Sequence, residues 1–430
     1  MSSYRLYLLI CGAGSFAAKM AFTLNLIYQA TVVGLSPLQL VLVGTLMEAV
    51  CFVAQVPTGV IADRYSRRLS VIAGYLLMGA GLLVWGLLPT YAAILVANVI
   101  WAIGAVCVDG AEEAWAADEI APDRVTRAFV RGGQLTQAGA LLGIVAAVGL
   151  TAVEPALPIV AGGVLTLALG VLLTVVMPET WRPAPTGSWR SAPRDSGRSA
   201  PPDSGRSAPT ESWRSMRRQV ADGARAVRHS TVLAGILGAT LFAGMSSEGF
   251  DRLSQPFLLP FVGDHPVELV FGALSMIAAL GSIVVTGLAG RWIDVVRPQR
   301  VGRVLAALQA LTAAGLIGLG WAGHWWAAVA LYLAVRLLRD STGPILNVWL
   351  VSATAPESRA TVFSIVAQAD ALGQVAGGPP AGFVAQRRAI GAGLSVAGLF
   401  VLPAVALLAL AAKRSPDPQP TTPAEPATMS

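Results

Sequence analysis

Twelve apolar stretches of about 20 residues recur along this chain, separated by charged or turn-forming segments. An α-helix needs about 20 residues to cross the roughly 30 Å hydrocarbon core of a bilayer. The chain is 55% hydrophobic and only 13% charged, with a mean hydropathy of +0.65, which excludes an ordinary soluble domain. We predict an all-α membrane protein with twelve transmembrane helices, near residues 6–31, 38–61, 69–89, 91–115, 128–150, 157–177, 231–262, 267–289, 301–320, 326–350, 362–384 and 390–411.

The composition changes abruptly between the sixth and seventh stretches. From Ser188 an eight-residue unit rich in Ser, Pro, Gly and Arg occurs three times before a partial fourth copy. Such a sequence buries too little apolar surface to offset the entropy cost of ordering. We therefore predict an N-terminal six-helix half at 1–180, a disordered linker ending in a short basic helix at 181–230, a C-terminal six-helix half at 231–412 and a disordered tail at 413–430.

Basic residues fall almost entirely on one side of the predicted membrane. The loops on that side and the chain end carry Arg64, Arg67, Arg68, Arg124, Arg127, Lys413 and Arg414. On the other side the clear exceptions are Arg387 and Arg388. The positive-inside rule then places both termini and the linker in the cytoplasm. The excess of Arg over Lys is typical of a high-GC bacterium, so we expect a multi-pass protein of a bacterial inner membrane. The net charge of +6 reflects this topology and does not indicate nucleic-acid binding.

The predicted loop after the second stretch carries a distinctive motif. Residues 59–68 read Gly-Val-Ile-Ala-Asp-Arg-Tyr-Ser-Arg-Arg, and a weaker copy with Gly290, Asp294 and Arg297 follows the eighth stretch. The pattern Gly-x-x-x-Asp-Arg-x-x-Arg-Arg resembles the signature loop of the major facilitator superfamily of transporters. The resemblance covers roughly residues 5–412. It implies two pseudo-symmetric six-helix bundles, with the first, fourth, seventh and tenth helices lining a central cavity.

Three further segments are similar to bacterial drug and tetracycline-type exporters, namely Pro57-Thr58-Gly59, Glu113-Ala114-Trp115 and residues 247–252. The exporters' Arg-x-x-Gln-Gly motif in the fourth helix is missing, and Gly143 in the fifth is followed by Ile144 in place of Pro. The resemblance implies a proton antiporter that exports compounds such as antibiotics.

Several other function classes lack the residues they require. No phosphate-binding Gly-x-x-x-x-Gly-Lys-Ser/Thr loop is present, and the two lysines, Lys19 and Lys413, lie outside any Gly-rich cradle. No catalytic motif indicates an enzyme. The three cysteines lie within predicted spans and the three histidines lack metal-ligand spacing, so we expect no metal and no cofactor. We interpret Gly139 and Gly143 as sites of close helix packing.

Ionisable side chains inside the predicted spans carry the remaining chemistry. Each costs about 2.5–3.5 kcal/mol if it faces lipid, so we expect it to face a cavity or a partner. The candidates for proton coupling are Glu48, Asp109, Lys19 and Asp370. We favour Glu48 as the proton carrier, because it lies in mid-span and Lys19 could pair with it in one state and release it in another.

A second group is predicted to line the substrate cavity. It comprises Glu248, Asp251, Arg252, Arg336, Arg339, Asp340 and Asn347. Two pairs within it, Glu248 with Arg252 and Arg336 with Asp340, could equally be structural ion pairs, since their members lie one helical turn apart.

A third group is predicted to form gating loops at the cytoplasmic side. It comprises Gly59, Asp63, Arg64, Arg67, Arg68, Glu112, Glu113, Asp118, Gly290, Asp294 and Arg297. Asp63 could cap a helix start in the other half. Arg67 and Arg68 could reach the acidic end of the fourth helix at Glu112, Glu113 or Asp118. The spacing of Asp109, Glu112 and Glu113 places these three on one helical face. We expect this network to hold an outward-facing state together and to break during the cycle.

Taken with the resemblance, these residues predict a monomeric secondary transporter for a small-molecule substrate and protons. Export of small amphipathic compounds is favoured. One alternative is a proton-coupled importer of a small metabolite. Arg336 and Arg339 would suit a metabolite that is negatively charged. Another is a transport-dead membrane sensor or scaffold that uses the octapeptide repeat as its contact.

Overall fold

The computed structural model describes residues 1–180, 230–293, 298–354 and 358–414. Within them the chain forms twelve long helical units and no strand, so the predicted all-α fold is confirmed. The expected linker, the octapeptide repeat, the basic helix, most of the tail, and the loop residues Asp294 and Arg297 lie outside the described residues.

The N-terminal bundle contains six helical units, two of them interrupted. Its helices are α1 (Ser3–Phe22), α2 (Asn25–Thr31), α3 (Pro37–Arg64), α4 (Arg67–Leu87), α5 (Tyr91–Val108), α6 (Ala111–Glu119), α7 (Pro122–Thr151) and α8 (Leu157–Val176). The first predicted span is α1 with α2, and the fourth is α5 with α6.

The break between α5 and α6 occurs at Gly110, whose φ of 73° is open to glycine and unfavourable for other residues. Asp109 is therefore the C-cap residue that follows α5, whereas Glu112 and Glu113 belong to the first turn of α6. The expectation that these three acidic residues share one helical face is wrong, because the helix does not continue through them.

The C-terminal bundle contains the other six units. Its elements are α10 (Thr231–Leu258) with the short η1 (Leu259–Phe261), α11 (Val267–Ile293), α12 (Pro298–Gly320), α13 (Trp325–Ala353), α14 (Arg359–Arg387) and α15 (Ile390–Arg414). Ten of the twelve units in the described part of the chain are long and apolar enough to cross a membrane. The remaining two, α13 and α14, are more polar. They coincide with the predicted spans at 326–350 and 362–384.

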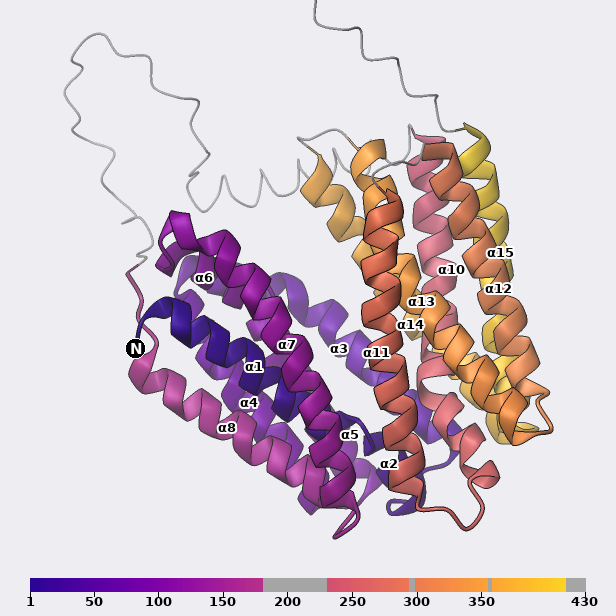
Figure 1. Ribbon diagram of the computed structural model, residues 1–430, viewed down its shortest axis with the longest axis horizontal. Coiled ribbons are helices and arrows are strands. Elements are labelled where there is room, and N and C mark those ends of the chain that lie inside the picture. Colours follow the sequence, from indigo (N-terminus) through magenta and orange to yellow (C-terminus); the bar gives the residue numbers. More distant parts are fainter. Residues whose placement is uncertain (181–229, 294–297, 355–357, 415–430) are drawn as a thin grey trace, which may run out of the picture.

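The two bundles lie side by side and diverge toward the end where α8 ends and α10 begins (Figure 1). At the opposite end α3 packs against α10 and α14, and α7 packs against α11. We call these the open end and the closed end. The closed end is apolar at its centre, where Ile27 and Val41 join a cluster with Phe250 and Leu253. Burial of apolar area thus holds the bundles together there.

Glycine allows close helix packing inside the N-terminal bundle, as predicted. A side chain at Gly139 would overlap the Gly12 carbonyl, and one at Gly143 would overlap the Phe16 carbonyl. These contacts join α7 to α1 and follow the small-residue packing usual in membranes. The interpretation of Gly139 and Gly143 as packing sites is confirmed.

Candidate functional site

Charged side chains on α10 and α13 form two ion pairs within their own helices. Arg252 Nε lies 3.3 Å from the Glu248 carboxylate on α10. Arg336 Nε lies 3.4 Å from the Asp340 carboxylate on α13. Both members of each pair are four residues apart and thus share a helix face. The two intrahelical pairs that the sequence offered are therefore formed.

A third ion pair joins α10 to α13. Arg339 donates through both terminal nitrogens to the two carboxylate oxygens of Asp251, at 2.8 and 2.9 Å. The Arg339 guanidinium also lies 4.8 Å from the centre of the Phe250 ring. Bidentate contact and stacking together fix an arginine firmly. The sequence predicted that both residues line the cavity but did not predict that they pair. The one sequence signal for this pair is that they carry opposite charges on two helices predicted to line the cavity.

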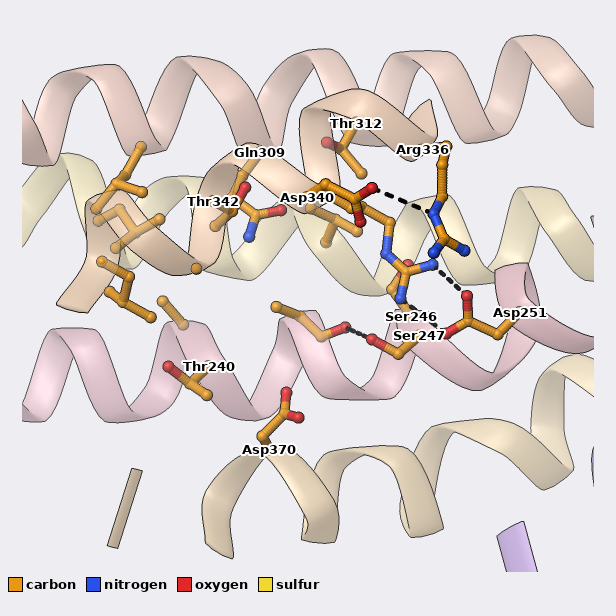
Figure 2. A pocket seen from close by; sticks show the side chains of 18 residues that line it. Thr240, Ser246, Ser247, Asp251, Gln309, Thr312, Arg336, Asp340, Thr342 and Asp370 are labelled. Atoms are coloured by element: carbon orange, nitrogen blue, oxygen red, sulfur yellow. Dashed lines mark hydrogen bonds and ion pairs between the residues drawn. The ribbon is translucent and has the colours of Figure 1, made fainter. Parts of the chain in front are cut away.

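These pairs border a pocket of about 430 Å³ among α10, α12, α13, α14 and α15. This volume falls within the range of small-molecule sites. Three carboxylates and two guanidinium groups line it, from Asp251, Asp340, Asp370, Arg336 and Arg339. The lining therefore has a formal charge of 2 − 3 = −1. In Figure 2 Asp370 points into the pocket from α14, opposite the wall that carries Gln309 and Asp340.

Three residues predicted for the cavity do not line this pocket. Asn347 is exposed on α13, beyond the lining positions of that helix. Glu248 and Arg252 lie instead against α3, where a side chain at Gly44 would overlap them. They belong to the contact between the bundles at the closed end.

Two predicted acidic residues have no ion-pair partner among the described residues. Asp370 accepts a hydrogen bond from Gln374 Nε2 at 2.9 Å. Glu48 lies on α3 within electrostatic range of Glu248, Asp251, Arg252 and Asp370, all from the other bundle. The two bundles thus bring Glu48 within electrostatic range of three carboxylates and of Arg252, which is itself paired with Glu248.

Lys19 and Asp109 lie apart from this group. Lys19 on α1 is within electrostatic range of Arg336 and Asp340 across the two bundles. The expected pairing of Lys19 with Glu48 is not formed in this state. Asp109 is exposed at the end of α5.

At the open end, Arg67 and Arg68 bind within the N-terminal bundle. Arg67 donates to Asp118 on α6. Arg68 donates to the carbonyl oxygens of Met177 at 2.7 Å and Thr174 at 2.6 Å, at the end of α8. Arg67 therefore makes the predicted contact with the acidic end of the fourth helical unit, at Asp118, whereas Arg68 binds carbonyl oxygens of α8 instead. Both contacts lie within one bundle and are formed although the bundles diverge here.

Among the other predicted gating residues, the structure describes the side chains of some and only the backbone of others. Glu112 accepts a hydrogen bond from the Tyr75 hydroxyl at 3.0 Å, and Glu113 is exposed. Gly59, Asp63 and Arg64 lie in the last turns of α3 and Gly290 near the end of α11, where the structure describes the helix but not the side chains. No group of three His, Cys, Asp or Glu residues in the described ranges could hold a metal ion.

Solved structures of several transporters have a similar fold. A bacterial homolog of the human lysosomal transporter Spinster, in an inward-facing and unoccupied conformation, gives a TM-score of 0.70 at 14% identity, with 96% of each chain covered. The nucleoside transporter NupG gives 0.73 at 13% identity, covering 97% of this chain and all of that one. A POT family transporter in complex with 5-aminolevulinic acid gives 0.68 at 12% identity, covering 95% and 96%.

Sequence comparison agrees with the fold. An uncharacterized MFS-type transporter of Bacillus subtilis (strain 168), YxaM, is 28% identical over 112 residues. That match spans about a quarter of each chain, 25% of this one and 27% of the other. The family model described as Major Facilitator Superfamily matches residues 8–378, which include the motif at 59–68 and its copy. The described residues form twelve helical units in two bundles, with a polar pocket inside the second, and the chain belongs to the major facilitator superfamily of transporters.

Proposed function

We propose that this protein is a secondary active transporter that couples proton movement to the export of small amphipathic compounds, such as antibiotics, by alternating access. The observation that supports this most directly is that Glu48 and Asp370, on opposite bundles, lie within electrostatic range of one another, both without an ion-pair partner in the described chain. A carboxylate inside a membrane protein is costly when it is charged and unpaired. A proton or a cationic substrate is therefore its natural partner.

The orientation of the protein in the membrane follows from the distribution of its basic residues. By the positive-inside rule the open end, which carries Arg67, Arg68 and Arg124, faces the cytoplasm. The state described is then inward-facing. The protein acts as a monomer in a bacterial inner membrane, and Asp63 in the loop motif gates the open end.

A proton-coupled importer of an anionic metabolite is the alternative, because two arginines line the pocket. Both already contact carboxylates: Arg339 binds Asp251 and Arg336 binds Asp340. An incoming anion would have to compete with these carboxylates, so the pocket favours a neutral or cationic substrate. A transport-dead sensor or scaffold would have no use for such a pocket.

Transport of ethidium in proteoliposomes tests the proposal. Ethidium is a permanent cation, so an acidic lumen alone does not trap it. We expect accumulation when the lumen is acidic, in vesicles that hold the protein with its cytoplasmic side outward, and none in protein-free vesicles. Accumulation driven only by an alkaline lumen would indicate import. Equal movement with and without a gradient would rule out proton coupling.

A further inference from the structure

Three polar groups that line the pocket make no ion pair within the described chain, and each comes from a different helix. They are Thr240 on α10, Gln309 on α12 and Asp370 on α14. Thr240 and Gln309 are only 8% and 7% exposed. Figure 2 shows Thr240 and Asp370 along one side of the pocket and Gln309 along the other.

The hydroxyl of Thr240 differs from the other hydroxyl groups around it. Ser247, Thr312 and Thr342 each donate to a carbonyl oxygen four residues earlier in the same helix. This is the usual way for a hydroxyl to be satisfied in a membrane helix. The Thr240 hydroxyl oxygen is buried and makes no hydrogen bond within the described chain. Because Thr240 lines the pocket, its hydroxyl has no partner in the described chain that would compete with a bound molecule.

The charges in the pocket indicate the sign of the charge that a bound molecule should carry. Arg339 is engaged at both terminal nitrogens by Asp251, and Arg336 contacts Asp340. Once these pairs are formed, Asp370 is the carboxylate that remains, and its described hydrogen bond comes from the neutral amide of Gln374. A charged group in such a place needs an opposite charge nearby. The partner that Asp370 lacks in the described chain is therefore a positive charge.

We propose that the pocket binds a substrate carrying a protonated amine, with Asp370 as the counter-ion and with Thr240 and Gln309 as hydrogen-bond partners for its other polar groups. The Gln309 amide offers both a donor and an acceptor. This inference rests on the proposed function and names the substrate class. It assigns Asp370, a candidate for proton coupling, to the substrate and leaves the proton to Glu48.

Three dansyl probes of similar size test the sign of the charge. They are the dansyl derivatives of ethylenediamine, ethanolamine and glycine, which are cationic, neutral and anionic at pH 7. Binding to the purified full-length protein in detergent is followed by dansyl fluorescence. We expect the cationic probe to bind about ten-fold or more tightly than the neutral one, since hydrogen bonds to charged groups are strong. The anionic probe should bind most weakly.

Variants of the full-length protein separate a binding role from a structural one. Asp370→Asn should remove the preference for the cation by weakening binding of the cationic probe far more than binding of the neutral one, while Asp370→Glu should restore the preference. Thr240→Val should weaken binding of the cationic probe several-fold. The matched control is Thr166→Val, because Thr166 is 7% exposed and donates to Gly162 at 2.8 Å in α8, away from the pocket.

Equal or tighter binding of the neutral or anionic probe overturns the inference, as does failure of all three probes to bind. An equal loss of both neutral and cationic binding in Asp370→Asn also overturns it. The binding assay uses no proton gradient, so a negative result in it can be told apart from a negative result in the transport assay for the proposed function. Cation-selective binding without gradient-driven transport would refute proton coupling alone.

Discussion

Glu248 on α10 places its carboxylate against the bare backbone of Gly44 on α3, across the contact between the two bundles. A methyl group at Gly44 would overlap both this carboxylate and the Arg252 guanidinium paired with it. Only 3% of Glu248 is exposed, so the pair has little room to withdraw. Glycine at position 44 therefore allows a complete ion pair to dock at the closed end, one helical turn from Glu48.

Replacing this glycine should open the closed end. Gly44→Ala introduces overlap that we expect to cost about 1–3 kcal/mol in the closed contact. The population should therefore shift toward states with the closed ends apart. Spin labels at Val153 and Trp321, which are 76% and 82% exposed at the closed ends of the two bundles, report this distance by electron–electron resonance. The three native cysteines are first replaced.

The control is Gly149→Ala, since a side chain there meets nothing within 4 Å. It should leave the distance distribution unchanged. If Gly44→Ala gives the same distribution as this control, the docked ion pair does not contribute to closure.

The Asp251–Arg339 pair should stabilise the C-terminal bundle. The two side chains are 38% and 24% exposed, so we expect less than the cost of breaking a fully buried pair. Asp251→Asn should lower stability by about 1–3 kcal/mol. Thermal unfolding in detergent measures this, and the double variant Asp251→Asn/Arg339→Gln should recover part of the loss.

An exposed pair provides the comparison. Arg124 and Asp123 are 68% and 74% exposed, so Arg124→Gln should change stability by less than about 0.5 kcal/mol. A double variant no better than the sum of its single changes would mean that Asp251 and Arg339 do not act as a pair.

Glu48 should carry the coupled proton. Glu48→Gln keeps the shape of the side chain but cannot exchange a proton. We therefore expect it to abolish gradient-driven accumulation of ethidium while exchange across the vesicle membrane persists. Glu154→Gln, in the exposed loop after α7, should transport normally. If the Glu48 variant still responds to the gradient, Asp109 becomes the candidate carrier.

Two acidic residues at the open end should behave differently. Asp63→Asn should slow turnover more than it weakens probe binding, because we assign Asp63 to the gate. Asp118→Asn removes the contact with Arg67 inside the N-terminal bundle. It should lower stability by about 1 kcal/mol or less and leave turnover unchanged. Loss of binding in Asp63→Asn with normal cycling of bound substrate would remove Asp63 from the gate.

Features set by local spacing were predictable from the sequence. The helical units follow from apolar stretches long enough to cross a bilayer, and the Glu248–Arg252 and Arg336–Asp340 pairs follow from the four-residue spacing of opposite charges. The break after Asp109 also has a local cause in Gly110, but a glycine within an apolar helix does not by itself distinguish a break from close packing.

The sequence by itself determined that the described chain consists of long helical units and which of these units carry charge. Only the tertiary structure decided that Asp251 binds Arg339, that Glu248 docks at Gly44, and that Lys19 lies within electrostatic range of Arg336 and Asp340. In a membrane the faces of a helix toward lipid and toward protein are both apolar, so the hydrophobic pattern does not specify how each helix is rotated. Contacts between distant helices depend on that rotation.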